Sequence, residues 1–227
     1  MHTIKLAVFD MAGTVVNEDN VVYKTLQKAI NTKGYKVSLD FVLVHGAGKE
    51  KHQAIKDILK AETGTTDVPL AKTIFAEFKE MLADAYLHLN VTSYSGLEEM
   101  LYALKESGIK VALNTGYDTA TAQLLLKKMD WHKGKEYDVL VTADDVELGR
   151  PNPDMILEAM LKMNIKNAAQ VLKAGDSIID IEEGKNANCG VTIGVTTGAH
   201  TREQLQSAKP TYVLDSLAEL KELISFE

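Results

Sequence analysis

Short apolar runs alternate with segments of helical periodicity along most of this chain, and this alternation limits the folds open to it. The first run, residues 4–9, is polar only at Lys5 and stops at Asp10. Runs of this kind are typical of strands buried on both faces of a parallel sheet. Similar runs lie at residues 110–113, 137–141, 170–174, 191–195 and 212–214. Strands separated by helices form βαβ units, so the sequence predicts an α/β fold with a parallel sheet and helices on both of its faces.

The alternation is interrupted once, between the first run and the second. From about residue 17 to residue 89 only helical periodicity is present, and its apolar spacing predicts helices over residues 21–30, 49–60 and 70–87. We therefore expect a small all-α domain at residues 18–89, inserted into an α/β core domain of residues 1–17 and 90–227. The two parts, about 70 and about 150 residues long, both match ordinary domain sizes.

Charge and cysteine content narrow the classes of function. The chain has 227 residues, with 25 Lys and Arg against 32 Asp and Glu, so its formal net charge of −7 argues against a basic surface for nucleic acid. The single cysteine cannot form an internal disulfide, which fits a reducing compartment. The first residues lack the apolar core of a signal peptide, and no stretch approaches the roughly 18 apolar residues of a membrane span. We therefore expect a cytoplasmic protein without membrane or nucleic-acid partners.

Polar side chains follow the predicted strands at the points where the strands end. Asp10 ends the first strand, Thr115 follows the second, and Arg150 lies in the loop after the third. Asp176 follows the fourth strand, and Asp180 comes one helical turn later. Because ligands of parallel α/β sheets bind beyond the carboxyl ends of the strands, these five side chains are expected to form one site.

The residue types in this predicted site indicate a metal ion and an anionic ligand. Its three carboxylates would repel one another when buried, and a divalent cation relieves that cost. Oxygen ligands alone favour Mg²⁺ over zinc. The Arg150 guanidinium and the Thr115 hydroxyl suit a phosphate group, and Gly13 and Gly116 would let backbone amides approach that group closely.

Each of these residues also has a purely structural interpretation. Asp10, Thr115 and Asp176 can each serve as a turn or helix-cap residue, and Asp180 can stabilise the first turn of a helix through the helix dipole. Arg150 can be a solvated loop charge. Structural roles at four successive strand ends would be four coincidences, so we favour the functional interpretation.

The motifs Asp-x-x-Gly-Thr at residues 10–14 and Gly-Asp-x-x-x-Asp at residues 175–180 resemble those of the haloacid dehalogenase superfamily of aspartate-nucleophile hydrolases. The resemblance implies a Rossmann-like core, a helical cap, and an aspartyl-phosphate intermediate on Asp10. It implies Mg²⁺ as the cofactor, bound by Asp10, the backbone carbonyl of Ala12 and Asp176, with Asp180 supporting the metal's waters or ligands. It also implies a small phosphorylated or phosphonate substrate, whose phosphoryl group is held by Gly13, Thr14, Thr115, Gly116 and Arg150.

Two positions depart from most phosphatases of this superfamily. The second Asp of their Asp-x-Asp motif protonates the leaving group and then activates water, and that position is Ala12 here. The usual lysine of their third motif is Arg150 here. Both departures are found in the phosphonoacetaldehyde hydrolases, or phosphonatases. The stretches Thr-Gly-Tyr at 115–117, Asp-Asp-Val at 144–146 and Gly-Arg-Pro at 149–151 are also similar to that subfamily.

Phosphonatases break a C–P bond, and in that family a cap lysine forms a Schiff base with the aldehyde and serves as the electron sink. Residues 45–52 resemble the segment that carries this lysine. Lys49 aligns with it, His52 matches an acid/base residue of the family, and Tyr117 matches an active-site tyrosine. We expect Lys49 in the first turn of the 49–60 helix, where the helix dipole and the nearby Lys51 would favour the neutral amine. The alternative is a solvated lysine after a glycine-rich turn.

These observations lead to the hypothesis of a Mg²⁺-dependent hydrolase that cleaves phosphonoacetaldehyde or a related phosphonate. A phosphomonoester phosphatase, acting on a small molecule such as phosphoglycolate, is the main alternative, and Ala12 argues against it. A non-catalytic metabolite-binding module is a further alternative, although binding alone would not need a nucleophile at Asp10. The cap bundle can mediate dimers in relatives, which is the basis for expecting a homodimer through the cap.

Overall fold

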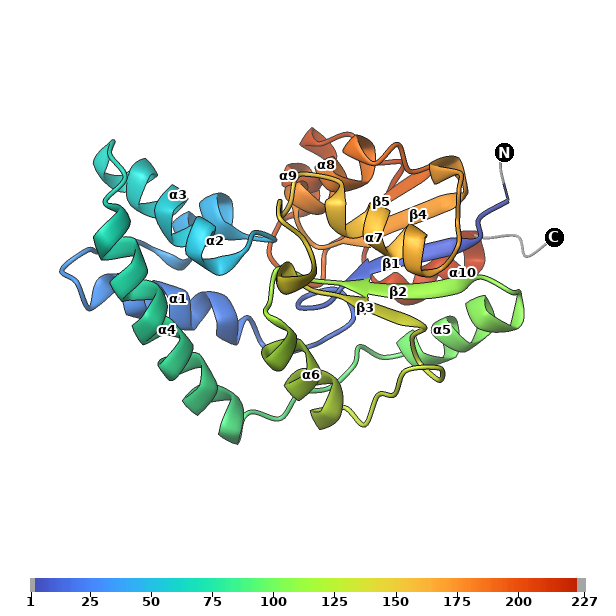
Figure 1. Ribbon diagram of the computed structural model, residues 1–227, viewed down its shortest axis with the longest axis horizontal. Coiled ribbons are helices and arrows are strands. Elements are labelled where there is room, and N and C mark those ends of the chain that lie inside the picture. Colours follow the sequence, from blue (N-terminus) through green and yellow to red (C-terminus); the bar gives the residue numbers. More distant parts are fainter. Residues whose placement is uncertain (1–2, 224–227) are drawn as a thin grey trace.

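The computed structural model describes residues 3–223 and contains a sheet-based core with a helical cap beside it (Figure 1). Within these residues, six parallel strands form one sheet in the order β3-β2-β1-β4-β5-β6. The strands are β1 (Leu6–Asp10), β2 (Lys110–Asn114), β3 (Val139–Val141), β4 (Val171–Gly175), β5 (Val191–Val195) and β6 (Tyr212–Leu214). The predicted α/β fold with a parallel sheet is confirmed.

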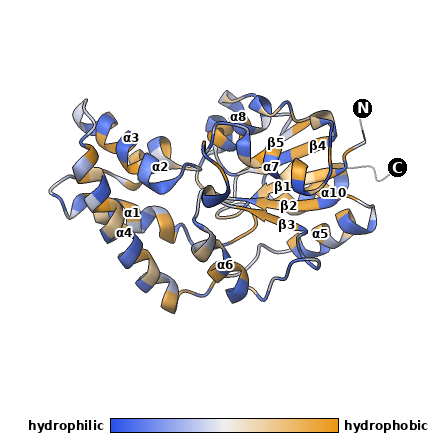
Figure 2. Cartoon of the chain, in the orientation of Figure 1, coloured by the Kyte–Doolittle hydropathy of each residue, from blue (hydrophilic) through white to orange (hydrophobic). Residues whose placement is uncertain are grey.

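Helices cover both faces of this sheet. On one face lie α7 (Asp154–Lys162), α8 (Ile178–Asn186) and α9 (Arg202–Ser207), and on the other lie α5 (Leu97–Glu106), α6 (Thr119–Lys128) and α10 (Leu220–Leu223) (Figure 1). Strand β1 is fully buried, because Leu6 and Val8 join the apolar cluster under α7 while Ala7 and Phe9 join the cluster on the opposite face. The strands are accordingly the most apolar part of the core (Figure 2). Burial of a side chain such as Phe9 contributes about 1.5–3 kcal/mol.

Four helices form the cap between β1 and α5. They are α1 (Val21–Asn31), α2 (Leu39–Gly46), α3 (Lys51–Thr63) and α4 (Val68–His88). The chain passes between core and cap at Asn17 and Thr92, whose backbones exchange two hydrogen bonds of 2.8 and 3.2 Å. The helical insertion after the first strand is therefore confirmed, while the limits of 18 and 89 stay predictions. In the described part of the chain, no helix combines the length and apolar character required to traverse a bilayer.

The cap differs from the sequence prediction in two details. Helix α2 was not predicted, because it is short and its apolar residues, Leu39 and Phe41 to Val44, are nearly consecutive and so give no helical period. The predicted 49–60 helix begins at Lys51 instead, so the prediction that Lys49 lies in its first turn is wrong. The reason is the carboxylate of Glu50, which accepts hydrogen bonds from the backbone N–H groups of His52 and Gln53 at 2.7 and 2.8 Å and so acts as the N-cap.

Candidate active site

The register of the sheet brings the predicted site residues to the carboxyl edge of its central strands. Asp10 is paired with Asn114, the last residue of β2, so Thr115 begins the adjoining loop. On the other side of β1, Phe9 is paired with Ala174 of β4, and this pairing places the loop of Asp176 next to Asp10. All five side chains predicted from the strand ends are buried there: Asp10, Thr115, Arg150, Asp176 and Asp180.

Three of these residues form a compact acidic cluster. Asp10, Asp176 and Asp180 each offer one carboxylate oxygen, and these oxygens lie within 4.8 Å of one another. Burial, together with the charges of Asp10 and Asp180, raises the pKa of Asp176 well above its usual value. Burial also raises the pKa of Asp10, although Arg150 opposes the shift. Burial acts on Asp180 as well, but Arg150 and Lys173 hold its pKa below the usual value.

The surroundings of the cluster fit a small cation. A Cβ atom at Gly13 or Gly198 would overlap the carboxylate of Asp176, so only glycine lets the backbone come this close. The Oδ1 atom of Asp180 is buried and accepts no well-aligned hydrogen bond, even though the Lys173 amine lies 2.9 Å away. Nη1 of Arg150 lies 3.2 Å from the same oxygen, so a metal ion bound there would share it with two protein cations. Carboxylate oxygens without nitrogen or sulfur donors match the preference of Mg²⁺.

Arg150 joins the cluster to the sheet edge. Its Nη1 lies 2.6 Å from Oδ1 of Asp10, and its Nε donates to Oε2 of Glu183 at 2.9 Å. Its Nη2 donates to the backbone oxygen and to Oδ1 of Asn114 at 2.9 and 2.7 Å. With only 1% of its side chain exposed, the guanidinium is fixed in one position beside the Asp10 carboxylate.

A second buried cation, which we did not identify from the sequence, supports this arrangement. Lys173 of β4 donates to Oδ1 of Asn114 at 2.7 Å and lies 3.2 Å from Oε2 of Glu183. Its signal in the sequence is a single charge inside the otherwise apolar segment 171–175.

The buried charges of the core at this site do not balance by themselves. If all of them are ionised, the carboxylates exceed the cations by two charges, which a divalent cation would balance. The groups counted are Asp10, Asp176, Asp180, Glu183, Arg150 and Lys173.

The remaining core residues lie around Asp10. The Thr14 hydroxyl is 3.5 Å from Oδ2 of Asp10, and Oγ1 of Thr115 accepts a hydrogen bond from the backbone N–H of Tyr117 at 3.2 Å. Ala12 is nearly buried and brings no acid or base to the loop. Gly116 touches the cap, since a Cβ there would lie 2.7 Å from the carbonyl oxygen of Lys49.

The two cap lysines differ sharply in their surroundings. The Lys49 amine pairs with Asp57 at 2.5 Å, and both side chains are partly exposed, while the Lys49 carbonyl oxygen faces Gly116 of the core. The Lys51 side chain is buried, and its amine lies 5.4 Å from the ring centre of Tyr23 and 5.3 Å from that of Tyr117. The same amine donates to the Lys49 carbonyl at 2.7 Å. Burial lowers the pKa of Lys51, with Asp10 opposing the shift.

His52 is not brought to the acidic cluster. Its ring packs on Phe75 of α4, with 5.4 Å between ring centres, and its Nε2 is buried without a hydrogen-bond partner among the described residues. Of the three residues matched to the phosphonatases, Lys49, His52 and Tyr117, only Tyr117 of the core lies next to the Lys51 amine.

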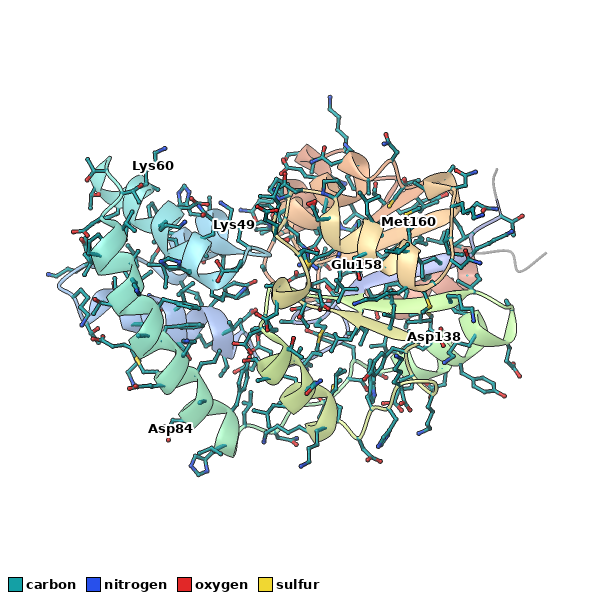
Figure 3. The ribbon with its side chains drawn as sticks, in the orientation of Figure 1. Lys49, Lys60, Asp84, Asp138, Glu158 and Met160 are labelled. Atoms are coloured by element: carbon teal, nitrogen blue, oxygen red, sulfur yellow. The ribbon has the colours of Figure 1, made fainter. Side chains whose placement is uncertain are left out.

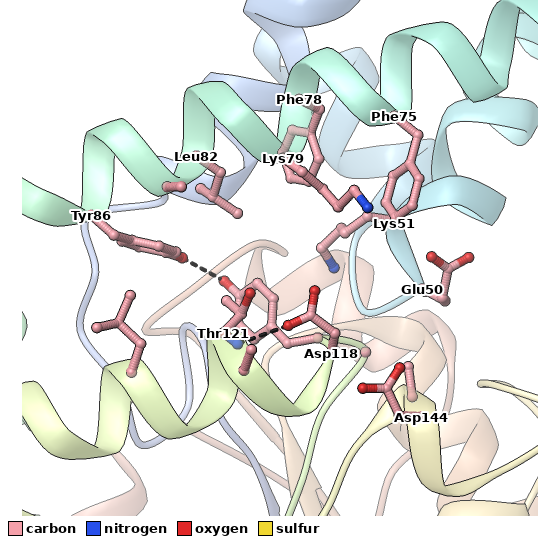
Figure 4. A pocket seen from close by; sticks show the side chains of 16 residues that line it. Glu50, Lys51, Phe75, Phe78, Lys79, Leu82, Tyr86, Asp118, Thr121 and Asp144 are labelled. Atoms are coloured by element: carbon pink, nitrogen blue, oxygen red, sulfur yellow. Dashed lines mark hydrogen bonds between the residues drawn. The ribbon is translucent and has the colours of Figure 1, made fainter.

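A cavity of about 560 Å³ lies between cap and core next to these two residues (Figure 4). Phe75, Phe78 and Leu82 of α4 form one wall, and residues of α6 and the loop before it form the opposite wall. Figure 4 shows the Lys51 side chain extending from the cap toward the core loop of Asp118, whereas Lys49 is not part of the lining. Figure 3 places Lys49 on the cap side that faces the core.

Comparison with known proteins agrees with this architecture. The family model described as haloacid dehalogenase-like hydrolase matches residues 7–195. A phosphonoacetaldehyde hydrolase of Latilactobacillus sakei is 30% identical over 207 residues, which cover 86% of this chain and 76% of that protein. A phosphonoacetaldehyde hydrolase of Parabacteroides distasonis is 27% identical, covering 97% and 95% of the two chains.

Among solved structures, a phosphonoacetaldehyde hydrolase like protein from Oleispira antarctica has a TM-score of 0.83 at 23% identity, with 98% of this chain and 91% of that chain covered. At this identity the likeness concerns the fold alone. The family match, by contrast, spans most of the chain, from β1 through the cap to the end of β5. The protein therefore belongs to the haloacid dehalogenase-like hydrolases and is an enzyme of that family.

Proposed function

We propose that this hydrolase is Mg²⁺-dependent and cleaves the C–P bond of phosphonoacetaldehyde or a related phosphonate that carries a carbonyl group. Asp10 is the nucleophile, and Lys51 is the amine that forms the Schiff base. One observation carries the proposal: a buried lysine amine faces a cavity at the cap–core boundary, close to a carboxylate cluster whose loop has alanine in place of an acid.

Asp10, Thr115 and Arg150 act on the phosphorus end of the substrate. Arg150 and the Thr115 hydroxyl bind the phosphonate oxygens, and a carboxylate oxygen of Asp10 attacks phosphorus from the end of β1. Bound Mg²⁺ supplies charge neutralisation for the carboxylates and the phosphonate at the same time. Water then cleaves the aspartyl phosphate, which releases inorganic phosphate and restores Asp10.

Lys51 acts on the carbon end. Its neutral amine forms a bond to the carbonyl carbon, and one proton is taken up as water leaves and the iminium forms. The later attack of water on the aspartyl phosphate releases one proton in return. When the C–P bond breaks, its electron pair moves into the iminium and gives an enamine, so no carbanion has to be stabilised in isolation. Protonation of the enamine carbon and hydrolysis of the resulting iminium release the aldehyde and restore the amine. Burial lowers the pKa of Lys51 and so increases the share of the neutral amine, which is the form that attacks a carbonyl.

Lys51 takes the role that the alignment gave to Lys49. The side chain of Lys49 is engaged with Asp57, and Lys49 is not among the residues that line the cavity. The two lysines are close in sequence, so a two-residue offset in the alignment is enough to exchange them.

The test is to incubate the protein with phosphonoacetaldehyde and Mg²⁺ and to measure phosphate and acetaldehyde. Borohydride reduction during turnover should attach the two-carbon unit to the peptide that carries Lys51, as identified by mass spectrometry. Lys51→Arg should lower kcat by about 10³-fold or more, because a guanidinium does not form a Schiff base at neutral pH.

Lys49→Arg is the matched control, since it preserves the partly exposed pair with Asp57 and should leave kcat within about twofold of wild type. Loss of activity in Lys49→Arg with full activity in Lys51→Arg would reverse the assignment. Hydrolysis of phosphoglycolate with no cleavage of phosphonoacetaldehyde and no borohydride adduct would instead favour a phosphomonoester phosphatase.

A further inference from the structure

Glu18 is a buried acid that the proposed chemistry does not yet use. It follows the Asn17–Thr92 backbone pair, at the point where the chain leaves the core for the cap, and only 2% of its surface is exposed. Its Oε2 accepts a hydrogen bond from the backbone N–H of Val22 at 3.0 Å, while its Oε1 is buried without any hydrogen-bond partner. Within residues 3–223, no Lys, Arg or His side chain forms an ion pair with it.

Two tyrosines connect this acid to the cavity. The Tyr86 hydroxyl oxygen of α4 lies 3.3 Å from Oε2 of Glu18 and 2.9 Å from the Tyr117 hydroxyl oxygen. Tyr86 donates to Glu18 when this acid is ionised and accepts from it when the acid is protonated. Tyr117 in turn lies under the amine of Lys51 and lines the cavity. The carboxyl group and the two hydroxyls therefore form a hydrogen-bonded path from the cap hinge to Tyr117, whose ring the Lys51 amine faces.

The environment of Glu18 suits a group that exchanges protons near neutral pH. Burial raises the pKa of Glu18 to about 7, although its two hydrogen bonds and the charges of Lys51 and Lys24 act in the opposite direction. Burial raises the pKa of Tyr86 and Tyr117 well above the usual value, so both hydroxyls keep their protons and can pass one on only by receiving another. The titratable groups facing Glu18 are Tyr23 and Lys24 of α1, Lys51 of α3, Tyr86 of α4, and Tyr94 and Tyr117 of the core.

We propose that Glu18 is the proton reservoir of the active site and acts through Tyr86 and Tyr117 in place of the acid that Ala12 does not provide. This inference rests on the proposed function, because it concerns protons that the Schiff-base reaction must move. Tyr117 is the catalytic residue of the path, and Glu18 is a positioning residue that supplies it.

The proton balance closes within the reaction itself. After C–P cleavage, the enamine carbon takes the proton of the Tyr117 hydroxyl, Tyr117 takes that of Tyr86, and Tyr86 takes that of Glu18, which becomes a carboxylate. When water hydrolyses the iminium, the aldehyde and the neutral amine form and one proton is released. That proton returns along the same path and restores the neutral carboxyl group of Glu18.

A purely structural role for Glu18 is to cap the start of α1 through Val22, and the test must separate the two roles. Glu18→Gln keeps an oxygen that can accept from Val22 but cannot titrate, and Tyr86→Phe removes the link while leaving Glu18 in place. Glu18→Asp restores a titrating group. Glu136→Gln is the matched control, because Glu136 is also buried but binds the backbone of His132 in the core, away from the cap.

The measurement is kcat and KM from about pH 5 to about pH 9, with phosphonoacetaldehyde or, if the wild type cleaves only esters, with phosphoglycolate. We expect the wild-type kcat to fall as the pH rises through the neutral range, because the protonated acid is required. Glu18→Gln and Tyr86→Phe should lower kcat by about 10²-fold, and their kcat should no longer fall as the pH rises through the neutral range. Their KM should change little. Glu18→Asp should recover the fall of kcat with rising pH, and Glu136→Gln should match the wild type in kcat and in its pH dependence.

The relay is overturned if Glu18→Gln keeps the wild-type kcat and its fall with rising pH, or if this substitution changes only KM or the melting temperature. If Glu18→Gln fails to fold, the pH dependence of kcat in Tyr86→Phe tests the relay in the same way. In the free protein, an infrared titration should reveal a carboxyl group that ionises near neutral pH and is missing in Glu18→Gln; an acid ionised throughout the range contradicts the proposal without any turnover. A borohydride adduct in the wild type and in a fully active Glu18→Gln would refute the relay alone, whereas no adduct in the wild type would refute the Schiff base.

Discussion

Arg150 is the residue whose removal should disturb the most interactions at the active site. It is the cation nearest to Asp10, and it also contacts Glu183 and Asn114. Its loss would leave buried carboxylates facing one another with Lys173 as the remaining core cation. The penalty therefore lies in uncompensated charge rather than in lost hydrogen bonds alone.

Arg150→Ala should lower the free energy of unfolding at pH 7 by about 3–5 kcal/mol and abolish turnover. The difference from wild type should shrink as the pH falls. Arg150 helps to depress the pKa of Asp180, so it contributes stability that is present above the usual carboxyl pKa and is lost as the pH drops through the depressed value. Urea unfolding at a series of pH values measures the difference in the free energy of unfolding between the variant and the wild type. Arg202→Ala, which breaks an exposed pair with Asp215, should cost less than about 1 kcal/mol, and an equal loss in both variants would contradict the argument.

At the scale of elements, the start of α3 decides which lysine reaches the cavity. Lys51 is the first residue of α3, whereas Lys49 precedes the N-cap residue Glu50 and lies outside the helix, so helical geometry places only the Lys51 side chain. The apolar spacing of the sequence predicted a helix here but not its first residue. The start depends on the Glu50 carboxylate folding back onto two backbone N–H groups, and glutamate is not a residue from which an N-cap is expected.

The core elements were predictable for a physical reason that does not extend to the contacts between them. Apolar runs define the strands, and parallel order brings Asp10, Thr115 and Asp176 to one edge whatever the detailed packing. The contact of Lys173 with Asn114 joins positions 59 residues apart, and the Glu18–Tyr86 contact joins positions 68 apart. Such pairs depend on the three-dimensional path of the chain, which local periodicity does not contain.

The loop between α2 and α3 is the cap element that docks on the core. The carbonyl oxygen of Gly48 accepts from Arg150 at 3.3 Å, and its backbone N–H donates to the Tyr23 hydroxyl at 3.1 Å. Gly48 has a φ of 74°, and a Cβ there would lie 2.5 Å from the Ser177 hydroxyl oxygen of the core. The contact thus has no room for a side chain.

Gly48→Ala should therefore hold the cap away from the core and lower kcat/KM by about 10- to 100-fold, because Lys51 would be displaced relative to Asp10. Gly64→Ala is the control: Gly64 has a similar φ of 77° but nothing within 4 Å of the added Cβ. Both variants should lose about 1–2 kcal/mol of stability from backbone strain, and only Gly48→Ala should lose activity. Steady-state kinetics with urea unfolding of both variants checks this, and equal activity in the two would show that the docking contact is unimportant.

At the scale of the whole molecule, the active site is the place where the two domains share their interior. One continuous apolar cluster runs from the core sheet into the cap, and it includes Phe9 of β1, Leu26 of α1 and Phe78 of α4. The acidic cluster lies beside this shared interior, where water does not screen its charges. Whatever neutralises those acids should therefore stabilise cap and core together rather than one loop.

Mg²⁺ should accordingly raise the melting temperature of the whole protein. A ligand at about 100 times its Kd stabilises the native state by about 2.7 kcal/mol, which for a chain of this length corresponds to about 5–10 °C. Asp176→Asn should abolish this shift. Without metal at pH 7, the same variant should melt above the wild type, because the raised pKa of Asp176 means that its charge opposes folding, and this advantage should vanish as the pH falls. Asp215→Asn, an exposed acid outside the cluster, should keep the full Mg²⁺ shift. If Mg²⁺ still raises the melting temperature of Asp176→Asn, the cation binds elsewhere, and the acidic cluster is not the Mg²⁺ site.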